Sequence, residues 1–171
     1  MSRGSGGGRT ALGPARSTSG LAESIEVQLR ARIAARGVEM FAGLILAAGA
    51  SRRMGTPKAL LTIDDETFLN RLIRTASGVC DPVLVVLRDR AHRGKAPFVI
   101  NPDPERGMLS SLQCGLESLS PETEAVIFTP VDYPLVTSDT YQRIAVGYGS
   151  SLAPVVIPVY RGRKAHPVCN P

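Results

Sequence analysis

Residues 41–58 read FAGLILAAGASRRMGTPK, an apolar run followed by a loop of small residues and cations. The apolar part predicts a buried strand, and the small residues at 47–50 let the backbone approach a ligand closely. Arg52, Arg53 and Lys58 surround the same loop with positive charge. A strand that leads into such a loop predicts a binding site for an anion, above all a phosphate chain.

The chain from residue 41 onward alternates strand patterns with helix patterns. Strands are expected at about 41–47, 82–88, 97–100, 124–130 and 154–160, and helices at about 67–77, 107–119 and 138–147. The runs at 83–87 and 125–128 are continuously apolar, as strands of a parallel sheet covered on both faces are. A polar turn is expected at 161–164. The pattern predicts an α/β domain over residues 41–171, with a mostly parallel sheet in a three-layer sandwich.

The first 40 residues differ from this domain in composition. Residues 1–20 form a basic, glycine-rich stretch that cannot bury enough apolar surface to offset the entropy of ordering, so we expect a disordered tail. Apolar residues then recur at every fourth position, at Leu21, Ile25, Leu29 and Ile33. Residues 21–39 are therefore expected to form a short appended helix and a linker. Met40 directly precedes the first strand, and we hypothesise that it is the true start.

The net charge of +5 lies mainly in the N-terminal segment. Six arginines and three glutamates precede residue 41, which leaves 14 basic and 12 acidic residues in the domain. This balance does not predict a nucleic-acid surface, and no apolar run reaches the roughly 20 residues of a membrane helix. Cys80, Cys114 and Cys169 are odd in number and widely spaced, which favours reduced thiols in a cytoplasmic protein.

Asp132 follows the apolar run at 125–128 and lies between Pro130 and Pro134. Open α/β sheets bind ligands at the carboxyl ends of their strands, and Mg²⁺ prefers one or two carboxylates together with phosphate oxygens. Capping of the next helix is an alternative role for Asp132, but Thr137, Ser138 and Asp139 are better placed for it. We expect Asp132 to bind the metal of a phosphate site.

The segment from Asn101 to Ser111 runs from a predicted strand through a proline-rich turn into a predicted helix. Gly107, Ser110 and Ser111 lie near the start of that helix and can contact ligand oxygens or a base edge. Helix capping is the alternative role of the two serines. His166 precedes a proline in an extended segment, where it either lines a substrate pocket or serves the structure.

These segments, in this order, resemble the MobA-like NTP transferases, and within them the molybdenum cofactor cytidylyltransferases. The family patterns L-A-A-G-x-S-x-R-M-G-x-x-K, N-P-x-x-x-x-G-x-x-x-S, G/V-D-x-P and G-H-P correspond to residues 46–58, 101–111, 131–134 and 165–167. Ala165 replaces the glycine of the last pattern, and Tyr133 stands where methionine is usual. The resemblance implies a nucleotide-diphospho-sugar-transferase-like, Rossmann-like fold.

The same resemblance implies a magnesium-dependent transfer of CMP from CTP to a phosphorylated acceptor such as molybdopterin cofactor, with release of pyrophosphate. Lys58, Arg53 and Asp132 would be catalytic, Asp132 would hold Mg²⁺, and Tyr133 and His166 would bind the acceptor. The nucleotide would contact Leu46, Ala47, Ala48, Gly49, Ser51, Arg53, Met54, Gly55, Lys58, Asn101, Gly107, Ser110 and Ser111. The loop is more similar to the cytidylyl branch than to the guanylyl branch, which tends to carry a second glycine, and this favours CTP over GTP.

Two alternatives to this function stay open. The acceptor could be a sugar 1-phosphate or another phosphorylated small molecule. The family usually continues for some tens of residues beyond the position of Pro171, so we expect this chain to be truncated at its C-terminus. A truncated chain could be an inactive nucleotide-binding or accessory protein of molybdenum cofactor metabolism, in contact with a molybdoenzyme.

Overall fold

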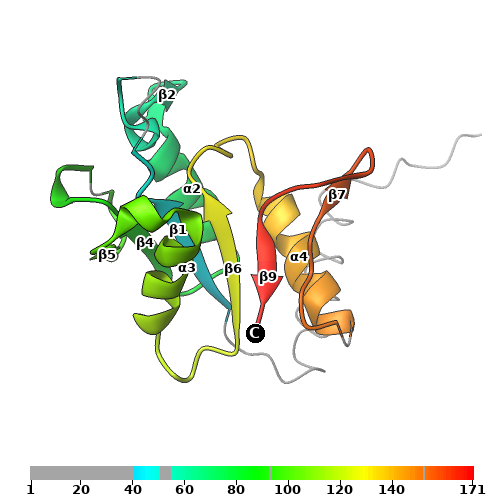
Figure 1. Ribbon diagram of the computed structural model, residues 1–171. Helices are drawn as coiled ribbons and strands as arrows, with labels where there is room; N and C mark the ends of the chain where they lie inside the picture. The colour runs from blue at the N-terminus through cyan, green and yellow to red at the C-terminus, as the bar shows by residue number, and fades with distance from the viewer. Residues whose placement is uncertain (1–40, 51–54, 93, 152) are drawn as a thin grey trace, which may run out of the picture.

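The structure, a computed structural model, describes residues 41–50, 55–92, 94–151 and 153–171 (Figure 1). The predicted N-terminal tail and appended helix lie outside these residues, and so does the loop at 51–54. Within them, the chain folds into an α/β domain built on one central sheet. No helix in this part of the chain is both long enough and apolar enough to cross a membrane.

Among the described residues, five strands form the central sheet in the order β5-β4-β1-β6-β9. Their bounds are Phe41–Ala47 for β1, Val83–Leu87 for β4, Phe98–Ile100 for β5, Ala125–Pro130 for β6 and Val168–Asn170 for β9. The strands β5, β4, β1 and β6 run parallel, while β9 is antiparallel to β6. The expected mostly parallel sheet is confirmed, and β1 has the predicted bounds.

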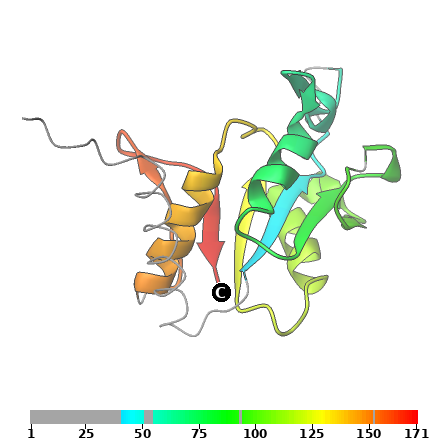
Figure 2. The ribbon, with the colours of Figure 1, turned by 180° about the vertical axis from the view of Figure 1, so that it is seen from behind.

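Helices cover both faces of this sheet, as the views from the front and from behind show (Figures 1 and 2). Their bounds are Phe68–Ala76 for α2, Met108–Glu117 for α3 and Ser138–Ser150 for α4. Helices α2 and α4 pack on one face with Phe41 and Ile45, while α3 packs on the other with Leu44 and Leu46. Side chains alternate between the faces of a strand, so β1 supplies both apolar cores. The predicted three-layer sandwich is confirmed.

The predicted strand at 154–160 does not form as a sheet strand. Val156 makes an isolated bridge to Cys169, and two-residue strands β7 (Val159–Tyr160) and β8 (Arg163–Lys164) pair with each other. Pro154 and Pro158 have no N–H to donate to a ladder, which explains why the apolar segment does not continue as a strand. The polar turn expected at 161–164 is confined to residues 161 and 162, which both have positive φ.

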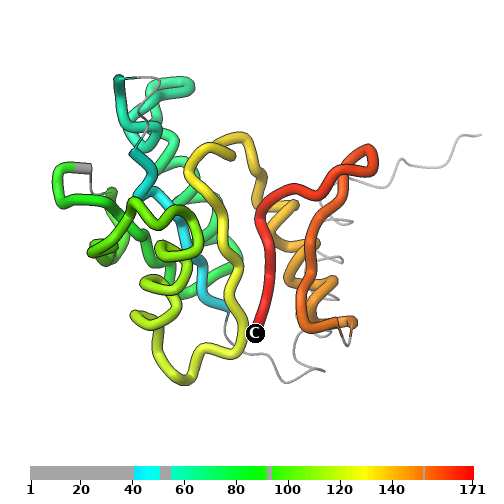
Figure 3. Tube along the Cα trace, viewed as in Figure 1, coloured from blue at the N-terminus to red at the C-terminus, as the bar shows by residue number. Residues whose placement is uncertain are grey.

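Short elements complete the described chain: η1 (Lys58–Leu60), β2 (Thr62–Ile63), β3 (Glu66–Thr67), η2 (Arg90–His92) and η3 (Pro104–Arg106). The strands β2 and β3 pair with each other before α2 begins. The trace in Figure 3 carries the segment after β6 and the segment before β9 to the same end of the sheet. The pairing of Phe128 with Val168 places the start of β9 beside the end of β6. The carboxyl ends of β1 and β6 and the start of β9 therefore share one edge.

Candidate active site

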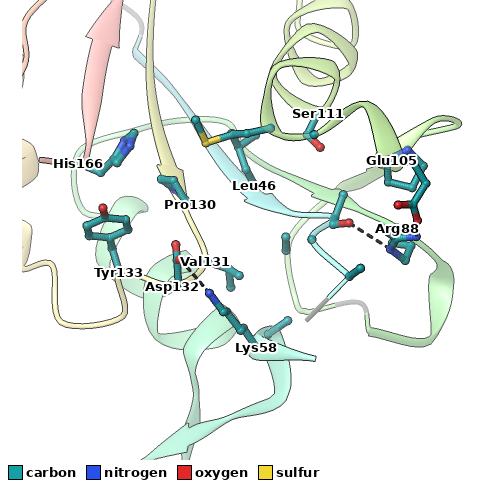
Figure 4. Close-up of a pocket in the computed structure, with 18 residues that line it drawn as sticks. Leu46, Lys58, Arg88, Glu105, Ser111, Pro130, Val131, Asp132, Tyr133 and His166 are labelled. Carbon is teal, nitrogen blue, oxygen red and sulfur yellow. Dashed lines mark hydrogen bonds and ion pairs between the residues drawn. The ribbon is translucent and has the colours of Figure 1, made fainter. Parts of the chain in front are cut away.

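A cleft of about 780 Å³ opens at this edge of the sheet (Figure 4). Its size is that of a small-molecule site. Its walls come from residues 46–50 after β1, Lys58 and Ala59 of η1, Arg88 after β4, residues 104, 105, 107, 108 and 111, residues 130–133 at the end of β6, and His166. Segments that are far apart in the sequence thus meet around one cavity.

The loop after β1 lines one side of this cleft. Leu46, Ala47, Ala48 and Gly49 all line it, as the sequence predicts. A Cβ added at Gly49 would meet no protein atom within 4 Å, so the space beside this backbone is open to a ligand. The predicted contact residues Ser51, Arg53 and Met54 lie outside the described residues, and Gly55 is described but does not line the cleft.

Lys58 and Asp132 meet across the cleft although 74 residues separate them. The Lys58 ammonium donates a hydrogen bond to Asp132 Oδ2 at 3.0 Å, and the two side chains are 38% and 45% exposed. The backbone N–H of Val131 donates to the Leu46 carbonyl at 3.0 Å, which holds the turn carrying Asp132 against the loop after β1. Both predicted charged residues therefore face the cavity that the phosphate loop lines.

The packing beneath this turn fixes the end of β6. The hydroxyls of Thr129 and Tyr141 are hydrogen-bonded at 2.6 Å, and both side chains are fully buried between β6 and α4. Thr137 caps α4, and its side chain accepts a hydrogen bond from the Thr140 N–H. The cap is thus one of the three residues expected for this role, which leaves the Asp132 carboxylate for the cleft.

The residues present fit a hard divalent cation that arrives with phosphate. Asp132 offers one cleft-facing carboxylate at the end of a parallel strand. No group of three or more His, Cys, Asp or Glu side chains among the described residues could hold a metal ion by itself. Mg²⁺ is commonly bound by one or two carboxylates while water and substrate phosphates fill its other positions. Asp132 thus suits a cation that shares its coordination with a nucleotide.

The predicted contact residues of the 101–111 segment divide into two groups. Gly107 and Ser111 line the cleft, but Asn101 and Ser110 do not. Gly107 joins η3 to α3 with a φ of +88°, in the left-handed region that favours glycine. This conformation turns the chain from the proline-rich segment into the helix and brings the start of α3 to the cleft.

Asn101 instead holds the wall together from behind. Its amide nitrogen donates to the hydroxyls of Ser110 and Ser111 at 2.9 and 3.0 Å, and its carbonyl accepts from the Asp103 N–H at 2.9 Å. Asn101 is 3% exposed and Ser110 8% exposed, so these are buried polar groups with partners. Asn101 and Ser110 therefore support the wall of the cleft without lining it, and their predicted contact with the nucleotide stays a prediction.

Arg88 and Glu105 line the cleft, and the sequence analysis did not include them. The Arg88 guanidinium donates to the Ala48 carbonyl at 3.2 Å through Nε and to Glu105 Oε1 at 2.8 Å through a terminal nitrogen. It thereby joins the loop after β1 to η3. Arg88 directly follows the apolar run at 83–87, so the strand-end argument used for Asp132 could have found it.

Tyr133 and His166, the predicted acceptor residues, lie in contact on the other side of Asp132 from Arg88 and Glu105 (Figure 4). The His166 ring packs edge-on against Tyr133 and Phe128, with ring centroids 5.1 and 5.5 Å apart. Burial lowers the pKa of His166, and the nearby charge of Asp132 only partly opposes this shift. Its Nδ1 is buried and has no hydrogen-bond partner among the described residues. The imidazole is therefore neutral at pH 7.

Residues 43–171 match the family model of the MobA-like NTP transferase domain. The chain belongs to this family. Within it, the chain is 32% identical over 130 residues to the probable molybdenum cofactor guanylyltransferase of Bacillus cytotoxicus. That match covers 72% of this chain and 64% of the Bacillus protein. The match to the molybdenum cofactor cytidylyltransferase of Escherichia coli is 28% identical over 133 residues and covers 73% of this chain and 67% of that protein.

The fold of this MobA-like domain also matches solved structures. The crystal structure of Rv0371c from Mycobacterium tuberculosis aligns with a TM-score of 0.67 and 28% identity, over 77% of this chain and 71% of that one. The resemblance and the fold expected from it are confirmed. Guanylyltransferases and cytidylyltransferases both stand among the relatives, so the preference for CTP stays a prediction. This chain spans 64% of the length of the Bacillus relative.

Proposed function

We propose that this chain is a magnesium-dependent nucleotidyltransferase that moves CMP from CTP to the phosphate of molybdopterin cofactor and releases pyrophosphate. The observation that carries the proposal is the meeting of Lys58 and Asp132 at 3.0 Å in a cleft lined by the small-residue loop after β1. A cation, a carboxylate and an open backbone at the carboxyl edge of a parallel sheet are what a metal–triphosphate complex requires. Three free cysteines accord with action in the cytoplasm.

The donor half of the site would hold the triphosphate through backbone and cation contacts. The N–H groups near Ala48 and Gly49 would bind phosphate oxygens, and Lys58, together with Arg53, would neutralise their charge. Gly107 and Ser111 would contact the nucleoside from the opposite wall, which Asn101 holds in place. In this arrangement the chain contributes mainly positioning and electrostatic stabilisation.

The transfer itself requires one bond to form and one to break. A phosphate oxygen of the acceptor attacks the α-phosphorus of CTP, and the bond from this phosphorus to the bridging oxygen of the β-phosphate breaks. A phosphate monoester is mostly doubly ionised at pH 7, since its second pKa is about 6. The nucleophile therefore needs no general base from the protein. Mg²⁺, held by Asp132, would neutralise charge on the triphosphate and on the leaving pyrophosphate.

The acceptor half would be the side of the cleft with Tyr133 and His166. Tyr133 supports a flat heterocycle there, because this residue is 40% exposed and its ring packs against the half-buried imidazole. A neutral imidazole supplies a hydrogen bond and no charge, which suits a pterin edge. Aromatic side chains contribute apolar surface with defined geometry to such a ring.

The preference for CTP rests on the form of the phosphate loop. Two alanines precede Gly49, whereas the guanylyl branch tends to carry a second glycine in this loop. The Ala48 side chain is buried in the core shared with Leu46, so the preference rests on the similarity of the loop to the cytidylyl branch and not on a contact between this methyl group and the base.

The experiment that tests this function measures pyrophosphate release by the purified chain with Mg²⁺. Each nucleoside triphosphate is combined in turn with molybdopterin cofactor, with sugar 1-phosphates, or with no acceptor. We expect release with CTP and molybdopterin cofactor, formation of a cytidylylated product by mass spectrometry, and loss of both in Asp132→Ala. Asp139→Ala is the matched control, because Asp139 is an exposed carboxylate of α4 paired with Arg143 at 2.8 Å.

Three other outcomes would each contradict part of the proposal. Release with a sugar 1-phosphate alone would change the acceptor. Release with GTP in preference to CTP would change the donor. Binding of CTP without turnover would favour an accessory role in molybdenum cofactor metabolism.

A further inference from the structure

The carboxylate that would bind the metal already has a cation beside it. Lys58 Nζ lies 3.0 Å from Asp132 Oδ2, and both side chains line the cleft. Figure 4 shows the lysine reaching from η1 directly to the carboxylate. An ammonium group at this distance stands where a divalent cation would have to approach the same oxygen, since metal–oxygen bonds to Mg²⁺ are about 2.1 Å long.

A divalent cation and this ammonium group compete for Asp132 Oδ2. Both are positive, and like charges a few ångströms apart repel even in water. A free cation that binds this oxygen must therefore displace Lys58 from it, and the cation itself brings no anion for the ammonium group. A metal–triphosphate complex is different, because its phosphate oxygens offer the ammonium group an alternative anion within the same cleft.

The geometry also indicates that the lysine is able to move. Both partners are more than one-third exposed, and ion pairs of this kind are weak because solvent screens them. A lysine carries a compact charge on a flexible four-carbon stem. The second ion pair that lines the cleft joins Arg88 to Glu105, and the Ala48 carbonyl accepts a further hydrogen bond from the same guanidinium.

We propose that Lys58 holds the place of the metal in the nucleotide-free protein, so that the site takes a metal–nucleoside triphosphate complex and not a free divalent ion. This inference rests on the proposed function, since it assumes that Asp132 binds the metal. Nucleotide phosphates draw Lys58 from the carboxylate, and the same movement opens Asp132 to the cation. Lys58 thereby couples metal binding to nucleotide binding.

Mn²⁺ is the probe for this coupling. The intensity of the free-ion signal in electron paramagnetic resonance falls as the protein binds Mn²⁺. Mn²⁺ is titrated into the full chain without nucleotide, for the wild type, Lys58→Met and Asp132→Asn, and for the double variant. We expect Lys58→Met to bind Mn²⁺ about tenfold more tightly than the wild type, because one repelling charge is removed. Binding should be lost whenever Asp132 is changed.

Two controls accompany the titration. Lys95→Met removes an exposed lysine that does not line the cleft, and it should leave Mn²⁺ affinity unchanged. With CTP but no acceptor, and with the Mn²⁺ bound by CTP alone subtracted in a titration without protein, the Mn²⁺ affinity of the wild type should rise by about tenfold or more, because Lys58 moves to the phosphates. Thermal unfolding of each variant checks that these surface changes leave the fold intact.

The outcomes separate this inference from the proposed function. Equal Mn²⁺ affinity of the wild type and Lys58→Met, lost in Asp132→Asn, would overturn the role of Lys58 and leave Asp132 as the metal ligand. An Mn²⁺ affinity that does not change when Asp132 is substituted would overturn both the role of Lys58 and the role of Asp132 as the metal ligand. Tighter, Asp132-dependent binding in Lys58→Met supports the inference even if no acceptor is turned over.

Discussion

The proposed donor side and the proposed acceptor side of the cleft are built in different ways. The donor side consists of backbone, small residues and a lysine within 46–58, supported by a buried hydrogen-bond network at Asn101. The acceptor side consists of ring contacts, with His166 between Tyr133 and Phe128. Phosphates are the same in every nucleotide and can be bound by a local motif, whereas an acceptor is recognised by side chains that the fold brings together. Substitutions on the two sides should therefore affect different kinetic constants: kcat or the nucleotide KM on the donor side, and the acceptor KM on the acceptor side.

The largest effect is expected on the donor side, from Lys58→Met. Removal of a cation beside the reacting phosphates should lower kcat by about 100-fold or more with every acceptor, because charge stabilisation in the transition state is lost. Steady-state pyrophosphate release measures this change. Lys95→Met is the control and should keep the wild-type kcat. A change confined to the acceptor KM would contradict the division of the cleft.

Asn101→Ala tests whether the donor wall depends on buried hydrogen bonds. The substitution leaves two serine hydroxyls and the Asp103 N–H without their amide partner. We expect the free energy of unfolding to fall by about 2 kcal/mol and the KM for the nucleotide to rise. Urea denaturation measures the first quantity. Ser118→Ala, which removes an exposed hydroxyl bonded to the Cys114 carbonyl, should change stability by less than about 0.5 kcal/mol.

His166→Phe tests the acceptor side with the ring packing retained. A phenyl ring keeps the contacts with Tyr133 and Phe128 but removes the ring nitrogens. We expect the KM for the acceptor to rise about tenfold, the cost of a hydrogen bond to a substrate, while the KM for the nucleotide stays the same. Initial rates at varied acceptor and fixed nucleotide concentration give this result. A rise in the nucleotide KM instead would place His166 on the donor side.

The smallest effect is the dependence of stability on pH through His166. Burial lowers its pKa in the folded protein below the ordinary value of 6.5. The unfolded chain therefore binds the proton at higher pH than the folded one, so stability is full above about pH 6.5 and falls as the pH drops toward the folded pKa. Thermal unfolding from pH 8 to pH 5 measures it. The wild type should lose more stability over this range than His166→Phe, and parallel curves would contradict the assignment.

Much of the fold could be predicted because it is encoded locally. Continuous apolar runs mark the strands β1, β4 and β6. Such runs indicate buried parallel strands wherever they lie in the sheet. The cap of α4 could be narrowed to Thr137, Ser138 and Asp139 because capping depends on a few neighbouring residues, and the structure has Thr137 there. The strand β9 was missed, since Val168–Asn170 is short and pairs with β6 only after the chain returns to it. The apolar segment at 154–160 was wrongly predicted as a strand. Its composition is that of a strand, but its two prolines have no N–H to donate to a neighbouring strand.

The sequence by itself determined the α/β class, the family, the loop of small residues after β1 and the placement of Asp132 at a strand end, because each of these depends on short local patterns. The tertiary structure decided which of those residues meet. It pairs Lys58 with Asp132 and packs His166 against Tyr133. It also places the hydrogen bond between Asn101 and Ser110 behind the wall of the cleft, and it adds Arg88 and Glu105 to that wall. Such contacts join segments that lie tens of residues apart in the sequence. A sequence pattern does not predict them, because the strand ends come together only when the sheet has formed and packed.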